Sequence, residues 1–279
     1  MKLISTIDTN PNPTAICALS PSSDNLYIAY PFKSSSAPFV STQSSNSYYV
    51  TGDIEIYDAQ ELAPVNVVQA HKSPLSCITM NSEGTLLATA SEKGTVIRVF
   101  TLPDANKVFQ FRRGSYPAKI YSMSFNLVST LLCVSSDTET VHIFKLPSEL
   151  SGTNIPHGKE YESANSQAGS ASVGQMLRRS SMNIGRNIGR NIAGSMGSYL
   201  PEMITEMWEP TRDFASLKLP SAGVRSIVAL SSTTPQVMVV TSEGFFYQYN
   251  IDLENGGECV PLKQYSLLEP SDDKDGGRE

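Results

Sequence analysis

The sequence lacks any apolar stretch long enough to cross a membrane, and its N-terminus has no signal pattern. A membrane-spanning helix needs about 20 apolar residues, and a secretory signal needs a basic segment before a shorter apolar one. Positive charge is also scarce, because 21 Lys and Arg stand against 27 Asp and Glu, which gives a net charge of -6. Such a chain is not expected to capture nucleic acid by general electrostatics. We expect a soluble protein that is able to contact a surface. Any function that needs positive charge must depend on a local group of basic residues.

Cysteine is scarce, and its four residues lie far apart in the chain, at Cys17, Cys77, Cys133 and Cys259. No pair has the spacing of a zinc site, so we interpret them as small core residues of a protein in a reducing compartment. The sequence also lacks a Gly-rich phosphate loop, an HExxH motif and a nucleophile elbow. We therefore predict no metal, no cofactor and no enzymatic activity.

The sequence does contain a repeat of short apolar strands separated by polar turns. Each unit has three such strands followed by an outer strand. One unit, for example, has strands at 75–80, 86–89 and 95–100 and an outer strand at 108–111. The middle strands recur at about 45 residues once two insertions are removed, which is typical of a four-stranded WD40-type propeller blade. We predict an all-β, WD40-like β-propeller.

The repeat divides the chain into an initial strand, four complete blades and a tail. The predicted ranges are an outer strand at 1–9, blades at 10–70, 71–114, 115–220 and 221–268, and a charged tail at 269–279. The insertions are serine-rich residues 32–51 in the first complete blade and residues 147–213 in the third. The apolar second strand of each blade is expected to be buried on both faces, and the outer strand to have one wet side.

The insertion at 147–213 has a polar first part, to about Ser172, which we predict to be disordered. Basic and apolar residues follow, and then apolar residues recur at helical spacing. These last residues are Met196, Tyr199, Leu200, Met203, Ile204, Met207 and Trp208. We predict an amphipathic helix that enters a lipid interface, with packing on the propeller as the alternative. Arg178-Arg179-Ser180-Ser181 is a candidate phosphorylation site whose modification would weaken membrane contact.

Two adjacent arginines close an alternating strand at Phe111-Arg112-Arg113-Gly114. Neighbouring side chains of a strand point to opposite faces, so the pair is placed to serve two sites rather than one. Arginine is a planar donor fork that suits phosphate. The pattern predicts two anion sites that flank one strand, and the alternative is a solvated strand end.

Several segments around this motif resemble the PROPPIN family, which consists of seven-bladed propellers that bind phosphoinositides. The resemblance is carried by residues 88–100, 111–114 and 135–146, with 7–13 and 256–259, and covers nearly the whole chain outside the insertions. It implies that the four blades are the fourth to the seventh and that residues 1–9 end the third. On this interpretation, the first two blades and most of the third are missing from the sequence. The missing blades could reflect a truncated gene product, an incomplete sequence, or a ring completed by another chain, and we favour truncation.

The resemblance also implies two headgroup sites, one on each side of the double arginine. The first comprises Arg112, His71, Thr89, Ser91, Gly94 and Arg98, and the second comprises Arg113, Gly114, Ser136, Thr138, Thr140 and His142. Their guanidinium and hydroxyl donors suit a headgroup with several phosphates. The alternatives are that His71 and His142 pack the blades and that Arg98 supports the fold.

The function implied by the resemblance is that of a peripheral membrane effector that binds phosphatidylinositol 3-phosphate and 3,5-bisphosphate. It would act in autophagosome formation and in vacuole and endosome traffic, located in the cytoplasm and on preautophagosomal, vacuolar and endosomal membranes. In the family, an autophagy lipid-transfer protein contacts the second blade. Because this blade is missing from the sequence, that partner is in doubt here. The alternative is a general WD40-type interaction scaffold without lipid selectivity.

Overall fold

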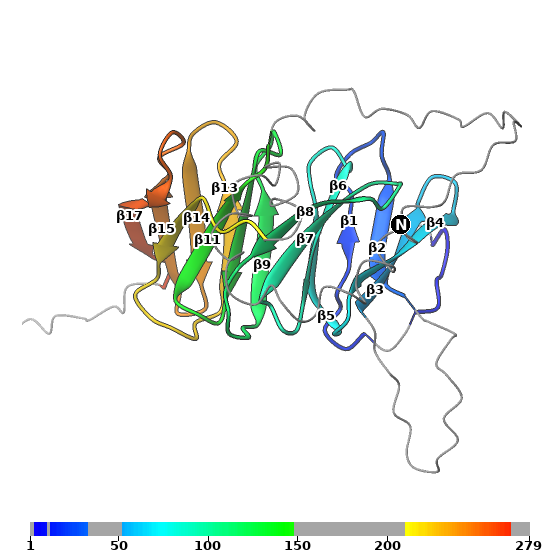
Figure 1. Cartoon of the computed structure of the whole chain (residues 1–279), viewed down its shortest axis with the longest axis horizontal. Helices are drawn as coiled ribbons and strands as arrows, with labels where there is room; N and C mark the ends of the chain where they lie inside the picture. The colour runs from blue at the N-terminus through cyan, green and yellow to red at the C-terminus, as the bar shows by residue number, and fades with distance from the viewer. Residues whose placement is uncertain (1–2, 10–11, 33–51, 148–209, 269–279) are drawn as a thin grey trace, which may run out of the picture. The chain divides into compact units, whose positions relative to one another are not determined.

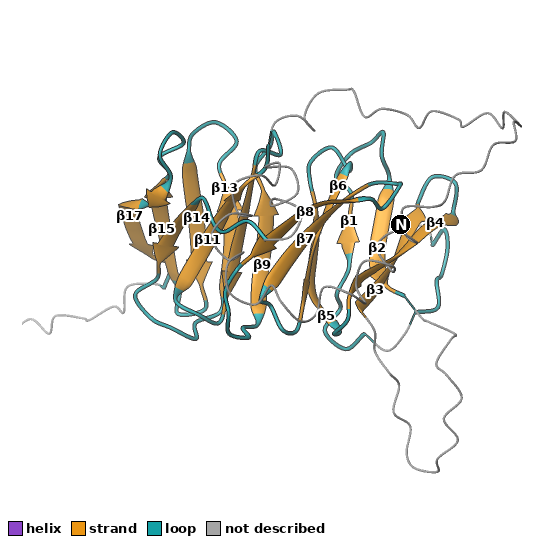
Figure 2. Ribbon diagram, viewed as in Figure 1, coloured by secondary structure: helices purple, strands orange, loops and turns teal. Residues whose placement is uncertain are grey.

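The computed structural model of the chain describes residues 3–9, 12–32, 52–147 and 210–268. All regular structure in these ranges is β-strand, as Figure 2 shows. No helix that could span a membrane occurs in the part of the chain that was described. The predicted all-β class is confirmed.

The strands of the described residues form four sheets, which follow one another in chain order (Figure 1). The first sheet contains β1 (Ala18–Leu19), β2 (Tyr27–Pro31), β3 (Gly52–Asp58) and β4 (Ala63–His71). The second contains β5 (Leu75–Met80), β6 (Leu86–Ser91), β7 (Val96–Thr101) and β8 (Lys107–Arg112). The third contains β9 (Ile120–Phe125), β10 (Leu131–Ser136), β11 (Thr140–Lys145) and β12 (Ala215–Lys218).

The fourth sheet contains β13 (Ser226–Leu230), β14 (Gln236–Thr241), β15 (Phe245–Asn250) and β17 (Val260–Ser266). Successive strands of every sheet pair in antiparallel order. The short strand β16 (Gly257–Glu258) crosses to the third sheet, where it pairs in parallel with β12. The last two sheets are therefore joined by a strand as well as by side chains.

The repeated turns have a physical cause that the sequence shows. Asn81 follows β5, and its side-chain oxygen accepts hydrogen bonds from the backbone of Thr85 and Leu86, both at 2.9 Å. Asn126 follows β9 and makes the same two bonds four and five residues further on. An asparagine that satisfies two backbone donors closes the turn between the first and second strands of a sheet.

Apolar side chains hold neighbouring sheets together in three clusters, each of which spans two consecutive sheets. The second strands β6 and β10 are buried along their whole length, as predicted, whereas the second strands β2 and β14 are buried only in part. In the middle cluster, Phe111 of β8 stacks on Phe144 of β11 with ring centroids 4.8 Å apart. This contact packs the strand that ends in the double arginine against the third sheet.

Three expectations about local structure are wrong. Residues 3–9 form no strand, and Leu3 and Ile4 are exposed, because an outer strand needs a neighbouring strand in the same sheet. Cys17 is exposed and Cys77 is partly buried, whereas Cys133 and Cys259 lie in the core as predicted. The outer strand β17 is exposed at every position instead of having one wet side, because nothing in the described residues packs on its inner side.

Candidate functional site

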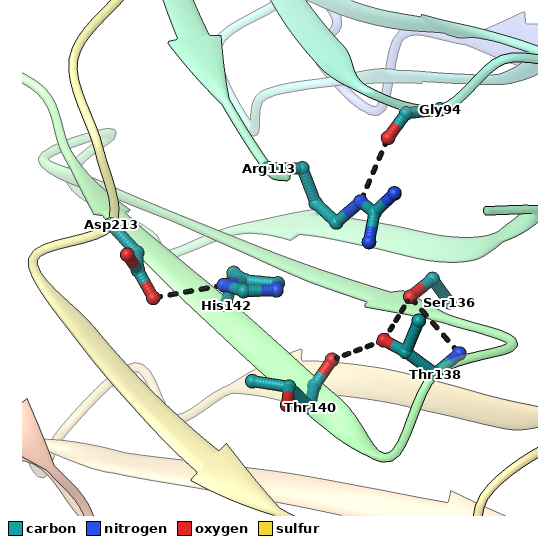
Figure 3. A network of polar contacts seen from close by, with 7 residues as sticks. All are labelled: Gly94, Arg113, Ser136, Thr138, Thr140, His142 and Asp213. Carbon is teal, nitrogen blue, oxygen red and sulfur yellow. Dashed lines mark hydrogen bonds and ion pairs between the residues drawn. The ribbon is translucent and has the colours of Figure 1, made fainter. Parts of the chain in front are cut away.

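The two arginines of 111–114 lie on opposite sides of β8. Arg112 is opposite Val96 of β7, and two residues earlier Gln110 is opposite Arg98, so alternation places Arg112 on the face of Gln110. Phe111 points the other way, toward Phe144 of the third sheet. Arg113 follows Phe111 on that side, where its guanidinium lies beside residues of β10 and β11 (Figure 3).

Figure 3 shows polar side chains of the third sheet on the side of β8 where Arg113 lies, and we call this group of residues, with Arg113, the second pocket. The arginine is 8% exposed and donates to the carbonyl of Gly94 at 2.8 Å and to that of Tyr116. Burial lowers the pKa of its guanidinium, while the nearby Asp137 carboxylate opposes that shift. Arginine carries five N–H donors, so two carbonyls leave others for a ligand.

The hydroxyls of the second pocket come from the turn between β10 and β11. Ser136 and Thr138 lie 2.8 Å apart between their oxygens, and Thr138 donates to the carbonyl of Thr140 at 3.4 Å. Figure 3 shows this group below the Arg113 guanidinium, with the ring of His142 beside it. The structure therefore places five residues of the predicted second site near one another, and Gly114 is not among them. They are Arg113, Ser136, Thr138, Thr140 and His142.

One member of this network was missed by the sequence analysis. Asp213 Oδ2 lies 2.8 Å from His142 Nδ1, and their side chains are 30% and 13% exposed. The hydrogen bond to His142 lowers the pKa of the Asp213 carboxyl, against the opposing effect of burial. The two residues are 71 positions apart on either side of an insertion, so no spacing could have paired them.

Several residues of the predicted first site lie on the other face of the second sheet, and we call this group of residues the first pocket. Thr89 of β6, Arg98 of β7 and Gln110 of β8 form one row across the second sheet. The Arg98 Nε donates to Gln110 Oε1 at 2.9 Å, and a terminal nitrogen donates to the carbonyl of Ala70 at the end of β4. Arg98 thus ties the first sheet to the second, which is the supporting role named as its alternative. Gln110 was not predicted.

His71 lies at the end of β4 and is 5% exposed, with Nε2 2.9 Å from the Thr89 hydroxyl of the neighbouring sheet. Burial and the nearby Arg98 charge lower its pKa from 6.5 to about 4. With this lowered pKa, the imidazole of His71 is neutral at pH 6. A neutral, buried imidazole between two sheets favours the packing role.

Arg112 differs from the other arginines of the two pockets. It is partly exposed, and the described residues include no hydrogen bond or ion pair to its guanidinium. Its backbone N–H, by contrast, donates to the carbonyl of Thr211 at 2.9 Å. A backbone held in place with an unpaired guanidinium is suited to an anion that comes from outside the chain.

The two glycines of the predicted sites have different surroundings. Gly94 has φ +56°, and a Cβ built on it would lie 1.8 Å from the carbonyl oxygen of Ala118. Its own carbonyl accepts from Arg113, so it belongs with the second pocket although the sequence assigned it to the first. Gly114 has open space around an added Cβ. Ser91 ends β6 and is buried.

The predicted membrane-inserting residues lie outside the described ranges, as do the arginines and serines of the candidate phosphorylation site. They are Met196, Tyr199, Leu200, Met203, Ile204, Met207, Trp208, Arg178, Arg179, Ser180 and Ser181. Their proposed role stays a prediction from the sequence.

Comparison with known proteins gives consistent results. A family model described as PROPPIN matches residues 1–163 and 178–268. The chain is 53% identical over 309 residues to autophagy-related protein 18 of Mycosarcoma maydis, covering 97% of this chain and 67% of that protein. It is 51% identical over 278 residues to the protein of the same name from Yarrowia lipolytica, covering 96% and 68% respectively.

Solved structures show the same fold. The complex of KlAtg21 with the coiled coil of AgAtg16 matches with a TM-score of 0.59 and 24% identity, over 91% of this chain. Hsv2 of Kluyveromyces lactis matches with a TM-score of 0.56 and 17% identity, over 90% of this chain. The chain spans 58% and 62% of the lengths of these two proteins.

Proposed function

The chain belongs to the PROPPIN family, and on this premise we propose that it binds phosphatidylinositol 3-phosphate and 3,5-bisphosphate through the two pockets beside β8. We propose further that it acts as a non-enzymatic, peripheral effector in autophagy and in vacuole and endosome membrane traffic. The curated relatives named autophagy-related protein 18 support the autophagy role.

The observation that carries the proposal is the divergence of Arg112 and Arg113. One guanidinium lies on the face of Gln110 and the other on the face of Phe111, so each borders a different set of side chains. The second set contains hydroxyls at Ser136 and Thr138, which suit phosphate oxygens. Two pockets on one strand allow the protein to engage two lipids of one membrane, which raises avidity over a single site.

Liposome flotation tests this proposal. We expect the double variant Arg112→Thr/Arg113→Thr to lose binding to vesicles that contain phosphatidylinositol 3-phosphate. Each single variant should keep part of the binding, because the other pocket survives. A charge-assisted hydrogen bond is worth about tenfold or more in affinity. The matched control is Lys107→Thr/Lys263→Thr, which removes two exposed positive charges from β8 and β17.

Unfolding must be followed in the same variants, because Arg113 also donates to two backbone carbonyls. If the double variant stays folded and binds vesicles as well as the parent does, the proposal is wrong. If the parent protein binds vesicles with and without the phosphoinositide equally well and still binds protein partners, the result would instead support the interaction scaffold.

Two further expectations concern the bilayer. Raised salt should weaken vesicle binding, since salt screens charges near the surface.

Replacing residues 173–208 by a Gly-Ser linker should leave the binding of a soluble headgroup unchanged and weaken attachment to vesicles. Unchanged attachment would show that this part of the chain is not an anchor.

A further inference from the structure

The contact between Asp213 and His142 fixes which ring nitrogen carries a proton. A carboxylate only accepts hydrogen bonds, so the proton of this 2.8 Å contact lies on Nδ1. The pKa of the Asp213 carboxyl is lowered by this bond, and the acceptor is therefore ionised at neutral pH. Figure 3 shows the other ring nitrogen turned away from Asp213, on the side where Thr138 and Arg113 lie.

The backbone around Asp213 is held on both sides. We call residues 210–213 the return segment, because they lead from residues 148–209 back to the third sheet. Thr211 donates to the carbonyl of Gln110 and accepts from the N–H of Arg112, at 3.2 and 2.9 Å. One residue beyond Asp213, the N–H of Phe214 donates to the carbonyl of Ile143 at 2.8 Å. The carboxylate is thus placed by β8 and β11 together.

The ring of His142 has one more neighbour that restricts it. Phe144, two residues along β11, lies with its ring centroid 6.2 Å away in a stacked arrangement. The charged groups near the imidazole are Asp213 and Arg113, with Arg212 beside the first and Asp137 near the second. Within the described ranges, the ring is held by one hydrogen bond and one ring contact, and of these two only the hydrogen bond selects the tautomer.

We propose that Asp213 is a positioning residue of the second pocket, which holds His142 so that its Nε2 faces the phosphoinositide headgroup. This inference rests on the proposed function. In the neutral ring, Nε2 accepts a hydrogen bond from an inositol hydroxyl, and in the protonated ring of the same orientation it donates to a phosphate oxygen. Without the carboxylate, the ring can rotate and either nitrogen can carry the proton.

Two variants separate the hydrogen bond from the side chain's bulk. Asp213→Asn keeps a carbonyl oxygen that can accept from Nδ1, whereas Asp213→Leu keeps a similar volume with no acceptor. All lipid measurements are made in an Arg112→Ala background, so that binding reports the second pocket. The probes are phosphatidylcholine vesicles with and without phosphatidylinositol 3-phosphate.

We expect Asp213→Leu to weaken binding about tenfold, to the level of His142→Ala, and Asp213→Asn to stay within about threefold of its parent. In a His142→Ala background, Asp213→Leu should have no further effect, because the carboxylate acts through the ring. An equal loss in both backgrounds, or no loss in either while His142→Ala still weakens binding, would overturn the inference.

A second measurement does not depend on lipid. The chain contains three histidines, so ¹⁵N-histidine labelling gives a simple spectrum in which His142→Ala identifies one ring. We expect its Nδ1 and Nε2 shifts to report a single tautomer in the parent and in Asp213→Asn, and a mixture in Asp213→Leu. Identical shifts in all three proteins would contradict the positioning role. If the shifts change as expected but His142→Ala leaves binding intact, the assignment of His142 to the pocket fails and the positioning of its ring stands.

Discussion

At the scale of single residues, the arginines of the two pockets differ in how many of their donors bond to the fold itself. Arg98 and Arg113 each donate to a backbone carbonyl of a neighbouring segment, at Ala70 and Gly94 respectively. Arg112 makes no such bond among the described residues. Because a guanidinium has five N–H groups in a fixed fork, one arginine can brace a pocket and still offer donors to phosphate.

The two pocket glycines give the first prediction. Gly94→Ala should lower the free energy of unfolding by about 2 kcal/mol or more, because alanine is strained at positive φ and its methyl group meets the Ala118 carbonyl. Gly114→Ala should leave stability within about 0.5 kcal/mol, since its methyl group meets no protein atom. If Gly114 lets a headgroup approach the backbone, the added methyl group should block that approach. The fraction of Gly114→Ala protein that floats with vesicles should then fall although the protein is stable.

Urea unfolding and vesicle flotation of both variants, side by side, check this prediction. A stable Gly114→Ala protein that binds as well as the parent would remove Gly114 from the second pocket.

The buried histidine gives the second prediction, on pH. The pKa of His71 falls from 6.5 when unfolded to about 4 when folded, so the unfolded chain binds the extra proton first. Stability therefore falls as the pH drops from about 6.5 to 4, by about 3 kcal/mol in total from this group. Urea unfolding at pH 7 and pH 4.5 should show a smaller difference in His71→Gln, which cannot titrate. Equal pH dependence in both proteins would contradict the neutral, buried histidine.

At the scale of elements, the return segment contacts two consecutive sheets, the second and the third. Its Thr211 forms a parallel bridge with Phe111 of β8, and Asp213 at its end contacts His142 of β11. The sequence analysis assigned residues 147–213 to an insertion, yet the last four residues belong to the folded sheets. The return segment therefore pairs with the backbone of β8 and places a carboxylate beside His142 of the second pocket.

The third prediction tests that bridge. Thr211→Pro should lower the free energy of unfolding by about 1–3 kcal/mol, because proline cannot donate to the Gln110 carbonyl. Thr211→Ala should have little effect, since the threonine side chain is exposed and both bonds belong to the backbone. Thermal unfolding of the two variants gives the comparison. A Thr211→Pro protein as stable as Thr211→Ala would show that the return segment is not held by β8.

At the scale of the whole molecule, sheet-to-sheet packing provides the core, and the fourth sheet has one face without such packing in the described residues. Ile227, Val240 and Tyr265 lie on that face and are 69%, 39% and 50% exposed. Phe246 lies between the last two in the register and packs on Tyr265 with ring centroids 6.0 Å apart. A contiguous apolar surface of this kind favours association.

The fourth prediction concerns this face. Ile227→Lys/Val240→Lys should reduce concentration-dependent self-association of the chain, because it places two like charges in the exposed apolar surface. The melting temperature should change little, since neither side chain is buried. Light scattering over a range of concentrations measures the effect, and Leu127→Lys/Val128→Lys, at an exposed turn of the third sheet, is the matched control. Equal scattering from parent and variant would show that the face does not drive association.

The sequence predicted the strand content well because the signals for it are local. Alternating and continuous apolar runs mark β6, β7, β10 and β11, and the turns between strands carry asparagine, glycine and serine. The predicted strand at 3–9 failed because a strand also depends on a neighbour, which local patterns do not report. The residues of the two predicted sites were named from the resemblance to a known family, whereas Asp213 and Gln110 were missed, since each acts through a partner distant in the sequence.

The sequence by itself determined the all-β class and the divergence of the two arginines, because side-chain alternation is a property of any extended strand and needs no tertiary contact. Only the tertiary structure decided which histidine is buried and neutral, which arginine has no partner among the described residues, and which carboxylate holds His142. Burial and charge pairing arise where separate sheets pack together. The residues that meet there are distant in the sequence, so local sequence patterns do not predict their contacts.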